Sequence, residues 1–259
     1  HRDLHLSIRR QRQMCIRDRT MIKLFICGIS GRLGSSIVNE IKKSSSISLV
    51  GGLVSGTNDD SKISSSVQGV EIISDLNVLQ EADVVIDCST SLDLTKIKEK
   101  CEQIGASLII ASTGKGELTE IFNKKSLSIP VLAAPNLSFG IAFLSILLVQ
   151  ASEKKLPLKK INIEETHLNK KFDTPSGTAL MLKKELKELF KLQDIEIISN
   201  RDESSIGTHK INLYLENEIL SLEHKALDRN AFAFGAVKLI EWIQFKPPGF
   251  YSLHDAVNN

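Results

Sequence analysis

The stretch IKLFICGISGRLGSSIVNEI, residues 22–41, decides the fold class. It opens with a continuous apolar run of the kind found in a strand that is buried on both faces. Gly28, Gly31 and Gly34 follow, and apolar residues then recur at helical spacing. A strand, a glycine-rich turn and a helix in this order predict the first part of a βαβ dinucleotide-binding unit.

Four further apolar runs continue this pattern, and they alternate with stretches of helical spacing. Buried strands that alternate with helices predict a parallel sheet covered on both faces. The fold class expected for this part of the chain is therefore α/β, a Rossmann-like doubly wound sheet. The four runs are ISLVGGLV (47–54), ADVVIDCST (82–90), SLIIAST (107–113) and IPVLAAP (129–135).

The pattern changes after Pro135. Long apolar or amphipathic stretches predict helices at 141–151, from Pro175 to Phe190, and again at 231–243. The end of the chain is expected to be a loop plus a short last element. Runs of strand type between these helices predict a second, α+β domain with a mostly antiparallel sheet. The strands are expected at 161–167, 195–200, 208–215 and 218–226.

Composition and charge exclude several classes of protein. The chain has 33 basic and 31 acidic residues, a formal charge of +2, which argues against a nucleic-acid partner. Its apolar runs fall short of the roughly 20 residues that cross a bilayer, so no membrane association is expected. Four cysteines occur without a CxxC pair, which argues against a metal site or a disulfide framework and fits a cytoplasmic location.

Residues 1–20 are rich in arginine and precede Met21, where we expect the fold to start. They lack the apolar core of a signal peptide. We expect a non-native or disordered extension, with a transit peptide as the alternative.

The glycine-rich turn predicts a nicotinamide dinucleotide cofactor. Glycine lets the backbone approach the pyrophosphate, and the following helix offers its amides. An NAD site usually carries an acidic residue at the end of the second strand, but that strand ends at Val54 and Ser55, and no carboxylate follows before Asp59. We therefore expect NADPH or NADH, with NADPH preferred and Arg32 as a partner for its 2′-phosphate. The alternative for Arg32 is a solvated surface charge.

Two later strand ends are also small and polar, at 87–90 and 111–114. Ligands bind at the carboxyl ends of strands in open α/β sheets, so both turns are candidates to line the nicotinamide. Each taken singly is also an ordinary helix N-cap.

The segment 165–179, ETHLNKKFDTPSGTA, combines features of an anion site. Pro175 suits the first position of a helix, so the residues after it would present backbone amides to a carboxylate. Lys171 adds a positive charge, and His167 can exchange protons near neutral pH. Taken alone, His167 is as well explained by a structural role, and Lys171 by solvation. Their proximity to the anion site favours function.

These motifs together resemble the dihydrodipicolinate reductase family. The resemblance rests on GISGRLG, DCST, ASTG, APNLSFG and ETHLNKKFDTPSGTA in this order, with HKALDRNAFAFGAVK and GFYSLHDAV nearer the C-terminus. It covers essentially all of Met21–Val257.

The resemblance implies NAD(P)H-dependent reduction of 4-hydroxy-tetrahydrodipicolinate, a small dicarboxylate, in lysine and diaminopimelate biosynthesis. It implies a dinucleotide-binding domain at 21–137, a substrate-binding and oligomerisation domain at 138–229, a C-terminal helix and tail at 230–259 that return to the first domain, and a homotetramer.

The resemblance also assigns residues by motif. His167 and Lys171 would be catalytic, and the substrate would contact Leu168, Lys171, Ser176, Gly177 and Thr178. The cofactor would contact Gly28, Ile29, Ser30, Gly31, Arg32, Leu33, Ser55, Ser112, Thr113, Ala134, Pro135, Asn136 and Leu137.

Two departures from the family pattern affect this assignment. The family usually has two adjacent histidines, and here Leu168 takes the place of the second. Leucine cannot donate a hydrogen bond, so Asn169 or Lys170 would have to substitute, or substrate affinity would fall. The ribose-reading position is Val54-Ser55 rather than an acidic-basic pair, so coenzyme preference does not carry over.

Two other functions fit parts of the sequence. The first is an NAD(P)-dependent dehydrogenase of another small acid, although such enzymes do not ordinarily carry the PSGTA helix start. The second is a catalytically silent nucleotide-binding protein, which only Leu168 supports. Retention of His167 and Lys171 argues against it.

Overall fold

The structure is a computed structural model that describes residues 21–54, 72–73, 76, 79, 81–112, 122, 127–154, 156–171 and 173–257. The described chain forms two compact units. The first runs to Pro135 and also contains Ala236–Ser252, and the second contains Asn136–Gly235 and the stretch from Leu253 onward. The predicted extension at 1–20, and predicted site residues Ser55 and Thr113, lie outside the described residues.

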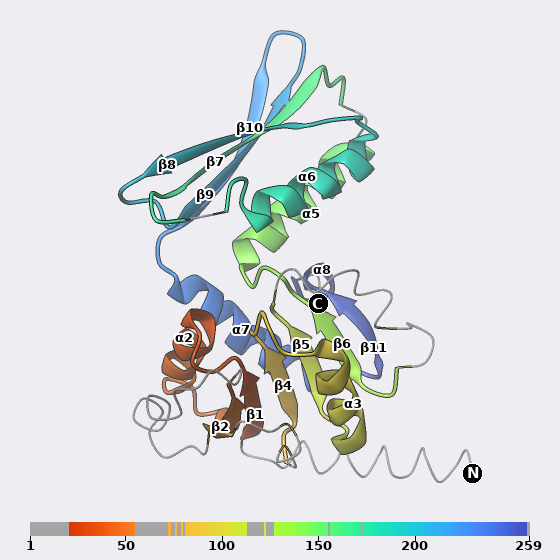
Figure 1. Cartoon of the computed structure of the whole chain (residues 1–259). Helices are drawn as coiled ribbons and strands as arrows, with labels where there is room; N and C mark the ends of the chain where they lie inside the picture. The colour runs from red at the N-terminus through yellow and green to blue at the C-terminus, as the bar shows by residue number, and fades with distance from the viewer. Residues whose placement is uncertain are drawn as a thin grey trace, which may run out of the picture. The chain divides into compact units, whose positions relative to one another are not determined.

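The first unit contains a fully parallel sheet, and its described strands lie in the order β11-β6-β5-β4-β1-β2-β3 (Figure 1). The strand order reverses between β1 and β4, as in other doubly wound folds. The predicted α/β class is confirmed. The strands are β1 (Ile22–Cys27), β2 (Ile47–Leu53), β3 (Ile72–Ile73), β4 (Val84–Asp87), β5 (Ser107–Ile110), β6 (Pro130–Ala133) and β11 (Gly249–Ser252).

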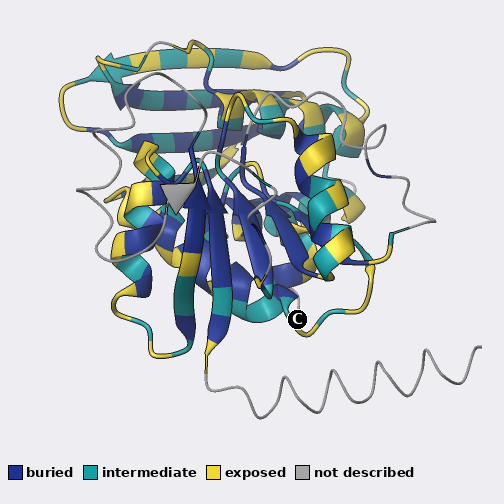
Figure 2. Ribbon diagram, turned by 60° about the horizontal axis from the view of Figure 1, so that its bottom comes forward, coloured by how far each residue is buried: buried dark blue, intermediate teal, exposed yellow. Residues whose placement is uncertain are grey.

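Helices cover both faces of this sheet. Helix α2 (Arg32–Ile41) connects β1 to β2, and α3 (Leu94–Ile104) connects β4 to β5. These two steps run in opposite directions along the sheet, so right-handed crossovers place the two helices on opposite faces. The central strands β1, β4, β5 and β6 are almost entirely buried, whereas the helices show a buried side and an exposed side (Figure 2). Helix α7 (Asn230–Ile243) spans the division between the units.

The second unit contains a mixed sheet in the order β10-β9-β7-β8. Strands β7 and β8 are parallel, and the other two pairs are antiparallel, which confirms the predicted sheet type. The strands are β7 (Lys160–Leu168), β8 (Glu196–Asp202), β9 (Gly207–Tyr214) and β10 (Ile219–Ala226).

Helices α5 (Phe139–Glu153) and α6 (Gly177–Phe190) lie along one face of this mixed sheet (Figure 1). Their apolar residues form a core with the strand residues that point toward them. Helix α8 (Leu253–Val257) lies beside α5. The core includes Leu144, Leu148, Ile161, Ile163, Ala179, Leu182, Leu186, Ile195, Ile211 and Leu213.

Two sequence expectations about secondary structure were wrong. Helix α6 begins at Gly177 rather than Pro175, because the Ser176 hydroxyl caps it by accepting a hydrogen bond from the Ala179 amide at 3.1 Å. The stretch Gly249–Ser252, expected to be a loop, is strand β11, which pairs with β6 at the edge of the parallel sheet. Its pairing partner is distant in sequence, so local pattern alone does not reveal it.

None of the helices in the described part of the chain combines the length and apolar character that crossing a membrane requires.

Candidate active site

The glycine-rich turn after β1 lies where the strand order of the parallel sheet reverses. Gly28 adopts a left-handed conformation with φ of +79°. A Cβ atom on Gly28 would lie 3.0 Å from the backbone carbon of Cys88 and from the backbone nitrogen of Ser89, which follow β4. Only glycine lets the two strand ends approach this closely. Ligands of open α/β sheets bind at such a position.

Helix α2 begins directly after this turn. Its N-cap residue, Gly31, has no side chain that could accept a hydrogen bond from the first amides of the helix. A Cβ atom on Gly34 would lie 2.4 Å from the carbonyl oxygen of Gly28, so the helix packs directly on the turn. Uncapped amides at a helix N-terminus bind phosphate groups. The backbone here therefore fits the pyrophosphate of a dinucleotide.

The predicted cofactor contacts in this turn differ in how much of each residue is accessible to a ligand. Ile29 is buried, and its side chain packs against Gly52, where an added Cβ would lie 2.4 Å from Ile29 Cδ1. Ile29 can therefore present only its backbone to a ligand. Ser30 and Arg32 are exposed, and Leu33 is half-buried.

A buried carboxylate organises the ends of the neighbouring strands. Asp87, the last residue of β4, accepts hydrogen bonds from the Ser89 amide at 2.9 Å and from the Ser112 hydroxyl at 2.7 Å. Ser112 was predicted as a cofactor contact, and Asp87 opens the turn 87–90 that was predicted to line the nicotinamide. Burial, assisted by the charge of Asp87, raises the pKa of Cys88 to about 12. The thiol is therefore protonated near neutral pH.

The predicted cofactor-binding stretch 134–137 spans the division between the two units. Ala134 and Pro135 belong to the first unit, and Asn136 and Leu137 to the second. Ala134 and Leu137 are buried, Asn136 is half-buried and Pro135 is exposed. Within the second unit, Asn136 donates a hydrogen bond to the Thr178 hydroxyl at 2.9 Å.

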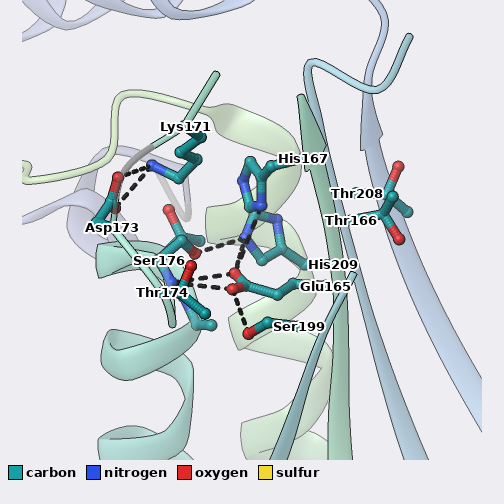
Figure 3. A network of polar contacts seen from close by, with 12 residues as sticks. Glu165, Thr166, His167, Lys171, Asp173, Thr174, Ser176, Ser199, Thr208 and His209 are labelled. Carbon is teal, nitrogen blue, oxygen red and sulfur yellow. Dashed lines mark hydrogen bonds and ion pairs between the residues drawn. The ribbon is translucent and has the colours of Figure 1, made fainter. Parts of the chain in front are cut away.

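The second unit places ionisable side chains in one row across its sheet. Paired residues of the four strands form rows across the sheet, and two successive rows face α5 and α6. One row is apolar, and the other contains one glutamate and two histidines. The apolar core is therefore followed by a polar cluster along the sheet, and Figure 3 shows this cluster. The apolar row is Ile197, Ile163, Ile211 and Leu222, and the polar row is Ser199, Glu165, His209 and His224.

Glu165 is the centre of this cluster, and it is fully buried. Its carboxylate accepts hydrogen bonds from the Ser199 hydroxyl at 2.7 Å and from the Ser176 amide at 3.0 Å. Burial alone would raise the pKa of Glu165, but these hydrogen bonds and the nearby His167 lower it below its ordinary value. Glu165 is therefore ionised at neutral pH.

His167 lies next to Glu165 on the same face of β7 (Figure 3). Its Nδ1 atom is 3.5 Å from Glu165 Oε2, and it has no hydrogen-bond partner in the described part of the chain. Burial lowers the pKa of His167. Glu165 and Asp173 oppose this shift, whereas Lys171 and Arg201 add to it. Gly207 on β9 leaves room for the ring, because an added Cβ would lie 3.2 Å from His167 Nε2.

His209 and His224 continue the row beyond Glu165. His209 Nε2 lies 3.3 Å from the Ser176 hydroxyl and 3.8 Å from Glu165 Oε2. Burial, together with the charge of His167, lowers the pKa of His209 to about 4, so it is neutral near pH 7. His224 Nε2 lies 3.1 Å from the Ser138 hydroxyl, and burial lowers its pKa as well.

The geometry of three of these side chains would also permit a metal ion. Ligand atoms of Glu165, His167 and His209 lie within 4.8 Å of one another. However, Ser176 and Ser199 already donate to both carboxylate oxygens of Glu165. The observed contacts are those of a hydrogen-bonded network, and we assign no metal to it.

Lys171 and the start of α6 lie beside this network (Figure 3). Lys171 Nζ donates to both carboxylate oxygens of Asp173 at 2.7 Å. Ser176 is fully engaged, since its amide binds Glu165 and its hydroxyl caps the helix. An added Cβ on Gly177 would have nothing within 4 Å, so the space beside this residue is open. The structure thus brings His167, Lys171 and the Ser176–Thr178 helix start together in one unit.

Leu168 lies differently from the other predicted substrate contacts. Side chains alternate along a strand, so Leu168 is on the opposite face of β7 from Glu165 and His167. It pairs with Asp202 on β8.

Several residues of the cluster had no role in the prediction from sequence. Arg201 pairs with His167 across β7 and β8, and its guanidinium donates to the Asp173 carbonyl at 2.7 Å and to the Thr174 hydroxyl. One signal was present in the sequence: His209 and His224 alternate in step with core residues of their strands. The residues without an assigned role are Glu165, Ser199, Arg201, His209 and His224.

Comparison with known proteins identifies the family. A sequence model described as "Dihydrodipicolinate reductase, N-terminus" matches residues 22–137, and one described as "Dihydrodipicolinate reductase, C-terminus" matches residues 140–257. The 4-hydroxy-tetrahydrodipicolinate reductases of Rickettsia akari and Bdellovibrio bacteriovorus are both 32% identical to this chain. The alignments cover 92% and 91% of the chain and 97% and 96% of those proteins, respectively.

A solved structure shows the same fold. Dihydrodipicolinate reductase from Paenisporosarcina sp. TG-14, solved with dipicolinate bound, superposes with a TM-score of 0.73 at 22% identity. The match covers 91% of this chain and 99% of that one. The matches over both parts of the sequence, together with this fold, show that the chain belongs to the dihydrodipicolinate reductase family.

Proposed function

We propose that this chain catalyses the NAD(P)H-dependent reduction of 4-hydroxy-tetrahydrodipicolinate to tetrahydrodipicolinate, a step of lysine and diaminopimelate biosynthesis. The observation that carries the proposal is the arrangement in the second unit. There, a buried histidine beside a carboxylate lies close to a lysine and to a helix start with free space beside Gly177. Relatives that match nearly the whole chain bear the name of this reductase.

The start of α6 is proposed to hold one substrate carboxylate. The amides of Gly177 and Thr178 lie in the first turn, where the helix dipole favours an anion. The Thr178 hydroxyl, which already accepts from Asn136, adds a further polar contact. Lys171 would pair with the same anion by exchanging its present partner, Asp173. Ser176 contributes through the cap that fixes this turn.

His167 is proposed to handle the proton. The reaction adds one hydride and one proton to the substrate and releases water. The reduced nicotinamide supplies the hydride when the cofactor is bound. His167 can take up or release a proton, and Glu165 stabilises its charged form against the effect of burial, which lowers the pKa of His167. Lys171 is proposed as the second proton donor.

The glycine-rich turn of the first unit is proposed to hold the cofactor. The close approach of Gly28 to the end of β4 and the uncapped start of α2 both support this. The residues from Gly28 to Leu33, with Ser55, Ser112, Thr113 and Ala134–Leu137, would contact it. NADPH is proposed as the preferred coenzyme, because no carboxylate follows Val54 before Asp59 and Arg32 is exposed in the turn.

We also propose a cytoplasmic homotetramer, which rests on the family alone. Light scattering on purified protein at several concentrations tests it. A mass of four chains is expected, and a monomer would contradict it.

A coupled assay tests the proposed reaction. Aspartate semialdehyde and pyruvate are condensed in the assay to make the substrate, and oxidation of NADPH or NADH is followed. Oxidation is expected only when both precursors are present, and it should be faster with NADPH. Absence of oxidation with either coenzyme would refute the proposal. A panel of other small acids, with each oxidised coenzyme, separates this enzyme from a dehydrogenase of a different acid.

A further inference from the structure

The Glu165 carboxylate contacts two parts of the candidate site at once. On one side, its Oε2 atom lies 3.5 Å from His167 Nδ1. On the other side, its oxygens accept from the Ser176 amide at 3.0 and 3.3 Å. Ser176 is the N-cap of α6, the helix start that is proposed to hold the substrate carboxylate. One buried charge therefore links the proton-handling histidine to the anion site.

We propose that Glu165 is a positioning residue of the reductase, which fixes the His167 ring and the start of α6 relative to each other and serves as the counter-ion of protonated His167. This inference rests on the proposed function. Glu165 itself is fully buried and does not need to touch the substrate. Its role is exerted through His167 and Ser176.

The surroundings of Glu165 suit this role. The Ser199 hydroxyl on β8 donates to Oε1 at 2.7 Å and so fixes the carboxylate from the neighbouring strand. His167 Nδ1 has no other partner among the described residues, so Glu165 is the group that can orient it. A contact of 3.5 Å becomes an ion pair when the imidazole takes up a proton.

Other charged and titratable groups also face His167, and none of them can replace Glu165. Arg201 on β8 and Lys171 both disfavour the protonated imidazole, and so does His209 on β9 when it is charged. Asp173 favours it, but this carboxylate is more than half exposed and binds Lys171. Glu165 is therefore the buried negative charge that supports protonated His167.

The test compares Glu165→Gln with Glu164→Gln. Glutamine keeps the size and a hydrogen-bond acceptor but removes the charge. Glu164 is the matched control, because it precedes Glu165 on the same strand but belongs to the opposite face, where it accepts from Asn212 at 2.7 Å. The readouts are kcat and KM as functions of pH in the coupled assay. Circular dichroism checks that each variant folds.

Glu165→Gln is expected to lower kcat by about tenfold or more, since a positioned proton donor contributes about 10²–10⁴-fold. The ionisation that the pH profile assigns to His167 should move to lower pH, because the charge that favours the protonated ring is gone. The His167 ionisation should move to lower pH whether the protonated or the neutral form of His167 is the active one. A purely structural role would not move this ionisation. Glu164→Gln should match the wild type in both readouts.

Glu165→Asp covers the case in which Glu165→Gln does not fold. It keeps the charge but withdraws the carboxylate by one methylene. We expect kcat to fall about fivefold or more, from the size of positioning effects, with the His167 ionisation closer to that of the wild type than in any uncharged variant. An active wild type with Glu165→Gln equal to Glu164→Gln, or with Glu165→Asp equal to wild type, would overturn this inference. An inactive wild type would instead refute the proposed function.

Discussion

The candidate cofactor site of the first unit and the polar cluster of the second unit are built in different ways. In the first, the decisive features are backbone features: the left-handed Gly28, the close packing of Gly34 and the uncapped start of α2. In the second, they are side chains that converge from strands far apart in sequence, with Glu165 on β7 and His209 on β9. A backbone site can be recognised from one local motif, whereas a side-chain site needs the register of the sheet.

This difference has consequences for mutation and for pH. Activity and stability that depend on the side-chain cluster should change when single ionisable groups are removed or protonated. The backbone site should be insensitive to both but should not tolerate one added methyl group.

His167→Gln should produce the largest effect. The variant cannot exchange a proton, so kcat should fall by about 10³-fold while substrate KM changes little. Steady-state kinetics in the coupled assay measures both constants. His254→Gln is the control, since that histidine is partly exposed and lies 3.7 Å from Glu185 on another element. An equal loss in kcat and in substrate affinity would reassign His167 to binding.

His209 should make the stability of the fold depend on pH. Its pKa is lowered to about 4 when folded, so below pH 6.5 the unfolded chain binds a proton that the folded chain does not. Unfolding free energy should therefore be fully retained above pH 6.5 and should fall by up to about 3 kcal/mol as the pH decreases to 4.

His209→Gln provides the comparison for this effect. Denaturant titrations at several pH values should show a shallower dependence in the variant than in the wild type. The dependence should not vanish, because burial also lowers the pKa values of His167 and His224. If unfolding free energy depends on pH equally in the variant and in the wild type, His209 is not buried in the neutral form.

Gly28→Ala tests the backbone site. An added Cβ would lie 3.0 Å from the backbone that follows β4, and φ of +79° strains any L-residue. A strain of about 1–3 kcal/mol should weaken coenzyme binding by about tenfold, as measured by fluorescence titration. Gly249→Ala is the control, since its Cβ would meet only ordinary contacts at 3.5 Å. Undiminished coenzyme affinity in Gly28→Ala would remove this turn from the cofactor site.

Asp173→Asn should have the smallest effect. Asp173 holds Lys171 through both carboxylate oxygens, so a substrate carboxylate that binds Lys171 as proposed would compete with it. An exposed pair contributes about 0.2–1 kcal/mol, so substrate KM should fall by about 1.4- to fivefold. Asp194→Asn is the control, because Asp194 pairs with Lys183 elsewhere in this unit. A rise in KM would mean that Asp173 orients Lys171 instead of competing for it.

Much of the fold could be predicted from local sequence pattern. The alternation of buried runs with helical spacing identified β1, β2, β4, β5 and β6, and the change of pattern after Pro135 identified the second domain. Strand β11 was missed because its evidence is pairing with β6, which no local pattern contains. The start of α6 was placed too early because Pro175 was taken as helical, when the Ser176 hydroxyl provides the cap.

The candidate site was predictable only where its residues are close in sequence. His167, Lys171 and Ser176–Thr178 lie within one short segment, and the structure brings them together. The role of Glu165 depends on Ser199, which comes from a different strand. His209 could have been noticed, because it alternates in step with Ile211 and Leu213. Its pairing with Glu165 across the sheet could not have been predicted from local sequence.

Transfer of deuterium from the coenzyme to the product tests most directly whether this chain reduces 4-hydroxy-tetrahydrodipicolinate. NADPH that carries deuterium at both C4 positions is supplied to the wild-type protein with 4-hydroxy-tetrahydrodipicolinate, and the product is analysed by mass spectrometry. We expect tetrahydrodipicolinate that carries one deuterium, formed in step with coenzyme oxidation. Coenzyme oxidation without deuterium in this product, or no oxidation at all, would contradict it.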